Sequence, residues 1–167
     1  MTIAIDVPKD ARALRDAFAC YPSGVTALCA VTQGEPTGMA ASSFTSVSLD
    51  PPLVSVCIQT SSATWQRLKD APRIGVSVLG EGHDAACRSL SSKTGDRFDG
   101  VDWSATPQGA IFVEGAAAHL DCSVHSTIDA GDHVIVLLAI HALGTQPGVE
   151  PLVFHGSRLR RLSPVAA

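Results

Sequence analysis

Three short segments hold most of the side chains that could do chemistry. Residues 39–56, MAASSFTSVSLDPPLVSV, place small and hydroxyl-bearing residues just before a hydrophobic run. Such residues allow a planar ligand to approach the backbone, whose N–H groups can bind its polar edge. Residues 59–68, QTSSATWQRL, place Ser61, Ser62 and Thr64 where a helix would begin, an arrangement that suits an anion. Residues 128–136, IDAGDHVIV, place Asp132 and His133 where a histidine could bind a ligand.

Each segment also has a purely structural interpretation. Residues 39–56 could be a strand edge and a polar loop, in which Pro51 and Pro52 set an extended entry into the next strand. Ser61 or Ser62 could simply cap a helix. Asp and Gly are ordinary turn residues, so the third segment could be a plain hairpin with His133 capping its turn. The residues alone leave these alternatives open.

Several other kinds of site are not indicated. The segment HLDCSVH, residues 119–125, has a metal-like spacing, but on a strand His119 and His125 would lie about 20 Å apart. We therefore predict no metal site. The chain has no G-x-S-x-G, S-x-x-K or H-E-x-x-H motif of a hydrolase. It also lacks the G-x-G-x-x-G and P-loop motifs, so a nucleotide would have to bind in another way.

Composition predicts one globular domain spanning residues 1–167, with an ordered core at about 10–163. The chain is 46% hydrophobic and 17% charged, with a formal net charge of −4, which argues against disorder and against nucleic acid as a partner. No long apolar run suggests a signal peptide or a membrane span, so a cytoplasmic location is expected. Five irregularly spaced cysteines predict free, mostly buried thiols.

Hydrophobic periodicity predicts a mainly β chain with a few short helices. Apolar residues at helical spacing predict a helix from Pro8 to Cys20, and further helical pieces are expected at 62–71 and 83–92. Strands are expected at 24–33, 52–59, 73–79, 114–127, 133–143 and 151–155, with Val25, Ala27, Cys29 and Val31 on one face. The short connections favour an antiparallel barrel, because closure removes exposed edges, with a β-sandwich as the alternative.

Four blocks taken together resemble the flavin reductase family of the FMN-binding split barrel, the small reductase components of two-component flavin monooxygenases. They are FACYPSGVTALCAV (18–31), GMAASSFTSVSLDPPLVSVCI (38–58) followed by SSATW (61–65), AGDHVIVLLAIHAL (130–143) and PLVFHGSRLRRL (151–162). The resemblance implies an antiparallel split barrel and hydride transfer from NADH or NADPH to FMN or FAD. It also implies a homodimer that supplies reduced flavin to a partner monooxygenase.

The resemblance also implies roles for particular residues. The flavin ring would lie on residues 39–43, the adjoining strand would contribute residues 57–59, and the phosphate end would lie near residues 62–65. The Gly-Asp-His motif would bind the nicotinamide cofactor, with His133 as the catalytic residue beside the reacting face. The implied cofactor-binding residues are Met39, Ala40, Ala41, Ser42, Ser43, Cys57, Ile58, Gln59, Ser62, Thr64, Trp65, Gly131, Asp132 and His133.

Three positions depart from the family pattern. Ala40, Ser77 and Leu159 stand where relatives more often have Thr, Asn and an aromatic residue, which points to weak flavin retention. Arg88, Lys93 and Arg97 could contact phosphates or form a solvated charged face. Two alternative functions are an FMN-binding electron-transfer module and a reductase whose bound flavin acts on a corrinoid or a ferric complex.

Overall fold

The computed structural model describes residue 7 and residues 10–163. Pro8, the expected first residue of the N-terminal helix, and residues 164–167 of the C-terminal tail lie outside the described residues. The helices are α1 (Ala11–Phe18), α2 (Ala63–Leu68) and α3 (Asp84–Ser91). The strands are β1 (Ser23–Gly24), β2 (Thr26–Thr32), β3 (Glu35–Ala41), β4 (Thr45–Leu49), β5 (Pro52–Gln59), β6 (Ile74–Val78), β7 (Trp103–Ala105), β8 (Ile111–Val113), β9 (Ala118–Ala130), β10 (His133–Thr145), β11 (Val153–His155) and β12 (Arg158–Arg160).

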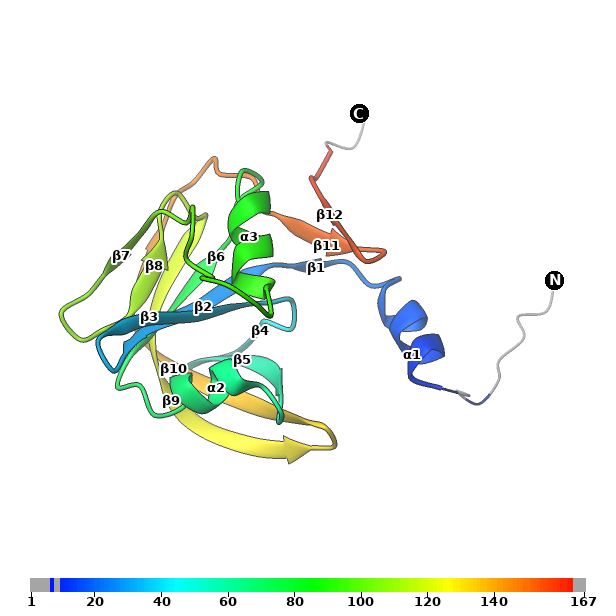
Figure 1. Cartoon of the computed structure of the whole chain (residues 1–167), viewed down its shortest axis with the longest axis horizontal. Helices are drawn as coiled ribbons and strands as arrows, with labels where there is room; N and C mark the ends of the chain where they lie inside the picture. The colour runs from blue at the N-terminus through cyan, green and yellow to red at the C-terminus, as the bar shows by residue number, and fades with distance from the viewer. Residues whose placement is uncertain (1–6, 8–9, 164–167) are drawn as a thin grey trace.

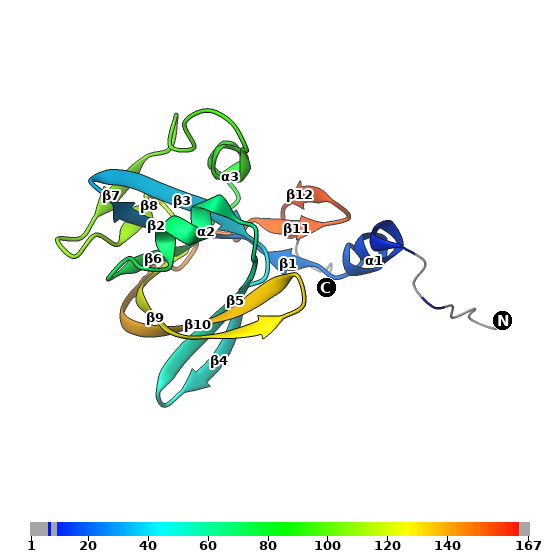
Figure 2. The same ribbon diagram turned by 60° about the horizontal axis from the view of Figure 1, so that its bottom comes forward.

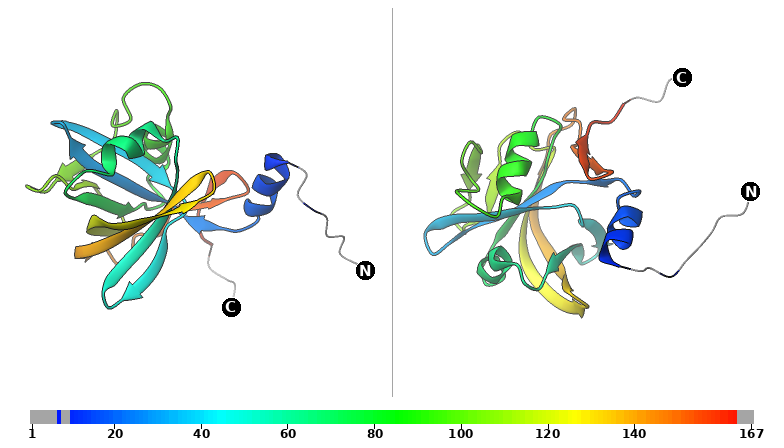
Figure 3. Two further views of the ribbon diagram at one scale, coloured as in Figure 1. Left: turned by 90° about the horizontal axis from the view of Figure 1, so that it is seen from below. Right: turned by 45° about the vertical axis from the view of Figure 1, so that its right-hand side comes forward.

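Seven strands form one antiparallel sheet in the order β3-β2-β6-β9-β10-β5-β4. The sheet curls, so that β4 and β5 lie across from β2 and β3 (Figures 2 and 3). Its edge strands β3 and β4 do not pair with each other, and the chain passes from one to the other through residues 42–44. The curled sheet with this gap is the split antiparallel barrel, and the predicted mainly β fold class is confirmed.

Two small sheets complete the structure. β1, β11 and β12 form a three-stranded sheet that lies beside α1, at one side of the molecule (Figure 1). The backbone N–H of Gly156, between β11 and β12, donates to the carbonyl oxygen of Ala19 at 2.9 Å. The N-terminal helix is therefore tied to the C-terminal hairpin. β7 and β8 pair with each other, and β8 lies against β2 and β6.

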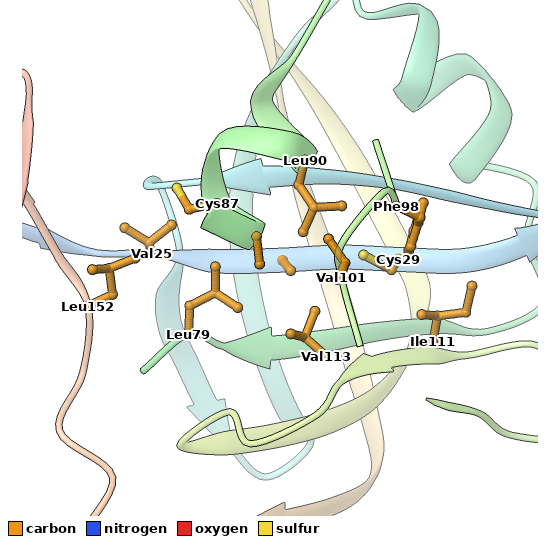
Figure 4. Packing of buried hydrophobic residues seen from close by; sticks show 12 residues of the cluster. Val25, Cys29, Leu79, Cys87, Leu90, Phe98, Val101, Ile111, Val113 and Leu152 are labelled. Atoms are coloured by element: carbon orange, nitrogen blue, oxygen red, sulfur yellow. The ribbon is translucent and has the colours of Figure 1, made fainter. Parts of the chain in front are cut away.

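β2 is buried on both faces and divides the core into two hydrophobic clusters. Val25, Ala27 and Cys29 lie in the first cluster, and Val31 packs against it, so the predicted common face is confirmed. This cluster also holds Cys87 and Leu90 of α3, which face β2 in Figure 4. The alternate residues Leu28 and Ala30 belong to the second cluster, which includes side chains of β5, β6 and β10. Burial on two faces explains the dense apolar sequence of this strand.

Two neighbouring side chains fix the β7–β8 hairpin on the main sheet. Ser77 Oγ accepts a hydrogen bond from the backbone N–H of Val113 at 3.0 Å. His119, the cross-strand partner of Ser77, donates from Nε2 to the carbonyl oxygen of Val113 at 2.8 Å. His119 thus serves the fold, and the described residues contain no group of three His, Cys, Asp or Glu residues that could hold a metal. Ser77 is fully buried, so it lies away from the open pockets.

The predicted elements need several corrections. The strand expected at 24–33 is interrupted at Val25, and the strand expected at 114–127 begins at Ala118, after a turn in which Gly115 has φ +75°. β3, β4, β7, β8 and β12 were not predicted. The register of β9 and β10 shifts twice, leaving His125 and His141 outside the regular pairing, so the strict alternation expected for residues 119–125 fails at His125. None of the helices within the described residues is long and apolar enough to cross a membrane.

Candidate active site

The segment that joins the two edges of the split sheet is held in place by Ser43. The Ser43 hydroxyl donates to the carbonyl oxygen of Cys57 and accepts from the backbone N–H of the same residue, both at 2.9 Å. These two bonds fasten the small-residue segment to β5. The hydroxyl of Ser43 is therefore engaged in bonds to the backbone of β5, whereas the neighbouring residue Ser42 is exposed.

A hollow of about 530 Å³ opens beside this segment, and we call it the β3 pocket. Its floor comes from the end of β3, where alanines let a ligand approach the backbone closely. α3 and the β11–β12 hairpin form its other walls. It is lined by Val25, Ala40, Ala41, Ser42, Asp84, Cys87, Arg88, Ser91, Phe154, Ser157, Arg158 and Leu159.

The Gly-Asp-His motif forms the tight turn between β9 and β10. Gly131 has φ +68°, a conformation that glycine adopts without strain. Thr60, at the end of β5, donates from its backbone N–H and its hydroxyl to the carbonyl oxygen of Asp132 at 3.1 and 3.2 Å. His133 pairs across the ladder with Gln59. These contacts fix the turn against β5. The structure thus contains the hairpin that the sequence predicted at this turn.

His133 and Asp132 form a side-chain pair at this turn. His133 Nδ1 lies 2.7 Å from Asp132 Oδ1. This hydrogen bond is the main reason that the pKa of Asp132 is lowered from its usual value. An ionised Asp132 accepts a hydrogen bond from the Nδ1–H group of His133 and leaves the Nε2 atom for a ligand.

A second hollow of about 530 Å³, the His133 pocket, adjoins the β3 pocket. The two pockets share Ser42, Phe154 and Ser157. The small-residue segment and His133, which are about 90 residues apart in the sequence, thus line two adjoining hollows. The His133 pocket is lined by Arg15, Phe18, Ala19, Tyr21, Ser23, Ser42, Ser43, His133, Phe154 and Ser157.

A smaller hollow of about 200 Å³, the Arg97 pocket, lies along β3 at residues 36–38. Arg97 Nη1 donates to Thr64 Oγ1 at 2.8 Å and to the carbonyl oxygen of Gly38 at 3.1 Å. Arg67 also lines this pocket, and neither guanidinium forms a salt bridge with any of the described residues. Two such cations beside hydroxyl groups suit a phosphate. Asp96 adds one carboxylate to the lining of this pocket. β3 therefore runs along both the Arg97 pocket and the β3 pocket.

The remaining predicted residues lie in different places. Ile58 and Trp65 are 2% and 4% exposed, and their side chains pack in the core. Ser62 caps α2 by accepting from the N–H of Trp65 at 3.2 Å, the structural alternative that the sequence left open. Met39, Cys57 and Gln59 line none of the three pockets, so their contacts with a flavin stay predictions. Of the candidate cations, Arg88 and Arg97 line pockets and Lys93 lines none of the three.

Several pocket residues were not identified from the sequence. Arg67 follows Thr64 by three positions, so a short helix beginning at Ala63 already places both on one side, and this signal was available. Phe154, Ser157 and Arg158 reach the site only because β11 pairs with β1. Arg15 reaches it because α1 is tied to the same hairpin. Pairing between the two ends of the chain leaves no local mark in the sequence.

This split-barrel protein thus carries small residues at two adjoining hollows and arginines at a third. A family model described as a flavin reductase like domain matches residues 18–163. An NADH-dependent FAD reductase from Streptomyces globisporus is 42% identical over 95% of this chain and 90% of its own length. The reductase subunit HsaB of a flavin-dependent monooxygenase from Rhodococcus jostii is 32% identical over 93% of this chain and 80% of its own length.

A solved structure agrees with these relatives. The NADH:FAD oxidoreductase of Streptomyces globisporus C-1027, in complex with NAD and FAD fragments, superposes with a TM-score of 0.91 at 41% identity, covering 99% of this chain and 100% of that one. The chain belongs to the flavin reductase family. It is accordingly an oxidoreductase whose cofactors are a flavin and NAD(H).

Proposed function

We propose that this protein reduces a flavin with NADH and releases the reduced flavin to a separate flavin-dependent monooxygenase. The observation that carries the proposal is the joining of the β3 pocket and the His133 pocket at Ser42. Each volume lies within the range of small-molecule sites, so the joined space suits two nucleotides placed side by side. When bound, the flavin supplies the hydride acceptor and the reduced nicotinamide supplies the hydride.

The protein's own groups position the two nucleotides and shape the space around them. Backbone groups at residues 40–42 bind the polar edge of the flavin ring, where charge increases on reduction. Arg97 and Arg67 hold its phosphate together with Thr64. His133 binds the nicotinamide cofactor through Nε2, while ionised Asp132 fixes the orientation of its ring. Because the hydride passes between the cofactors, no paired acid and base is required of the protein.

The name of one relative supports FAD and NADH as the first choices among the possible cofactors. A relative at 42% identity is named an NADH-dependent FAD reductase. The β3 pocket supports release of the product, because Ala40 and Leu159 offer a flavin neither a hydroxyl group nor an aromatic face. A flavin held without those contacts dissociates more readily. Five free thiols support a reducing cytoplasmic setting.

Anaerobic titration tests this function. Purified protein with FAD or FMN is mixed with NADH or NADPH, and the flavin absorbance is followed. Bleaching by NADH and a flavin affinity weak enough for dialysis to remove the flavin are expected. Failure of both nicotinamide cofactors to bleach either flavin above the protein-free rate contradicts the reductase function. A tightly retained flavin that NADH does not bleach favours the electron-transfer alternative.

Thiol labelling tests where the flavin lies. Burial raises the pKa of the Cys29 and Cys122 thiols to about 12 and also raises the pKa of Cys87, so these thiols stay protonated and unreactive at neutral pH. Cys20 and Cys57 are exposed. We expect two of the five thiols to react in the native protein. Because Cys57 adjoins Ser43, saturating FAD should slow its labelling by about tenfold or more, whereas Cys20 serves as the unprotected control.

Two outcomes of the labelling would contradict these expectations. Reaction of three or more thiols before unfolding would show that the buried cysteines are accessible. Equal labelling rates at Cys57 with and without FAD would place the flavin away from β5. The variant Cys57→Ser identifies the signal, since it leaves Cys20 as the reactive thiol.

We also propose that the protein is a homodimer. The edge strand β4 carries Val47 and Leu49, which are 49% and 97% exposed. An exposed edge strand with large apolar side chains is a template for association unless something covers it. A second copy of the chain would remove both the edge and the apolar surface from water.

Light scattering on a sizing column tests the dimer. The wild-type protein should elute with twice its 17.3 kDa chain mass. Val47→Asp places a charge on the proposed contact and should raise the dimer dissociation constant by about tenfold or more, because an unpaired charge would be buried. Leu162→Asp alters an exposed leucine outside the main sheet and is the control. An unchanged mass for Val47→Asp at micromolar concentration would contradict this interface.

A further inference from the structure

The N-terminal helix α1 lies outside the core yet has a defined position. It buries none of its residues, and Figure 1 shows it standing beside β1 and β11 rather than over the main sheet. Asp10 caps its first turn by accepting from the N–H of Ala13 at 2.8 Å. Its C-terminal end is tied to the β11–β12 hairpin by the bond between Gly156 and Ala19. The helix α1 is therefore held in a defined position without contributing side chains to the hydrophobic core.

α1 contributes part of the wall of the His133 pocket. Arg15 and Phe18 lie one turn apart on the helix, and both line this pocket. Tyr21 and Phe154 add two more aromatic side chains. Arg15 is the one permanently charged residue among the described residues that line the pocket. The pocket thus combines a cation, aromatic surfaces and small hydroxyl groups.

Arg15 lines the same pocket as His133 but forms no ion pair with Asp132. Its positive charge contributes, as a minor cause, to the lowered pKa of Asp132. Within the described part of the chain, no carboxylate lies within 4.0 Å of Arg15, since the ion pairs there involve Arg73, His133 and Arg161. Arg15 therefore keeps its hydrogen-bond donors for a ligand. Arg12, on the same helix, lines none of the pockets described above.

This chemistry fits a phosphate-bearing dinucleotide. The chain carries a net charge of −4, so an anionic cofactor entering the His133 pocket needs a local cation. Aromatic side chains provide flat surfaces for the bases, and an arginine binds phosphate oxygens through two donors. We propose that Arg15 binds the pyrophosphate of the nicotinamide dinucleotide and thereby positions it beside His133. This inference rests on the proposed reductase function and adds a cofactor-binding role for α1.

The test compares two hydride donors that differ in charge. NADH carries the pyrophosphate, whereas 1-benzyl-1,4-dihydronicotinamide is uncharged and has no phosphate. Steady-state flavin reduction is measured with both donors for the wild type and for Arg15→Ala, Arg15→Lys and Arg12→Ala. For Arg15→Ala we expect the KM for NADH to rise about tenfold or more, with kcat changed less than about twofold. Its rate with the uncharged donor should equal that of the wild type.

The other variants separate charge from structure. Arg15→Lys should recover part of the affinity, because it keeps the charge and loses the paired donors. Arg12→Ala should behave as the wild type. A wild-type KM for NADH in Arg15→Ala overturns the role of Arg15 and leaves the reductase function intact. An equal loss with both donors overturns it too, because that result assigns Arg15 a structural role. If the wild type reduces flavin with neither donor, the reductase function itself fails.

Discussion

Replacing Gly75 by alanine should lower the free energy of unfolding by about 3 kcal/mol or more, since overpacking against backbone is costly. Gly75 lies in β6, between β2 and β9. A Cβ atom there would overlap the carbonyl oxygen of Ile111 in β8 and would lie 2.7 Å from its carbonyl carbon. Backbone atoms cannot rotate away as a side chain can. The β7–β8 hairpin would have to lift off the sheet, which would strain the bonds of Val113 to Ser77 and His119.

Gly144→Ala is the matched control for this prediction. Gly144 also lies in a strand, β10, but a Cβ atom there would meet nothing within 4 Å. Its free energy of unfolding should stay within about 0.5 kcal/mol of the wild type. Urea unfolding followed by tryptophan fluorescence measures both variants. If Gly75→Ala unfolds at the same urea concentration as Gly144→Ala, the close approach of β6 and β8 is wrong.

The strands with dense apolar sequence could be predicted because burial leaves a periodic pattern. β5 begins and ends where the sequence placed it, at Pro52 and Gln59, and β6 differs by one residue at each end. The Asp-Ala-Gly-Asp turn also marked the β9–β10 hairpin correctly. These elements carry their own signal because the core contacts that stabilise them fall on regularly spaced residues.

Other strands could not be predicted, because long-range pairing stabilises them. β3 contains Pro36 and Gly38, which are both disfavoured in strands by local preference, yet it pairs with β2 over its whole length. Gly38 fits because Cys29 and Phe98 leave no room for a Cβ atom. β12 is a charged three-residue strand that forms only on β11. In these places tertiary contacts override local propensity.

The same limit applies to the candidate site, because a sequence motif combines residues with different structural roles. Residues 40–43 and His133 line the two adjoining pockets, and their contacts with a flavin and a nicotinamide cofactor stay predictions. Ser62, in contrast, uses its hydroxyl to cap α2, and Trp65 packs in the core. A motif indicates where the chain passes a ligand, but it does not separate the residues that face the ligand from those that hold the motif in place.

His133→Ala should lower kcat/KM for NADH by about tenfold to a hundredfold, because it removes a hydrogen-bonding group that faces the joined pockets. The affinity for FAD should change less than about twofold, since the residues of the β3 and Arg97 pockets are untouched. His125→Ala is the control, because His125 is exposed on the same hairpin and lines neither joined pocket. Stopped-flow reduction gives the rate, and flavin fluorescence gives the affinity.

Asp132→Asn separates the orientation of His133 from its presence. The hydrogen bond from His133 lowers the pKa of Asp132, so the wild-type carboxylate is ionised at neutral pH. It becomes protonated only when the pH falls through that lowered pKa. Asparagine keeps the shape but removes the charge that fixes the ring. We expect a smaller loss than in His133→Ala, about threefold to tenfold in kcat/KM, because the Nε2 atom of His133 is still present to bind the cofactor. Wild-type kcat/KM in His133→Ala would contradict any role of this pair in binding the nicotinamide cofactor.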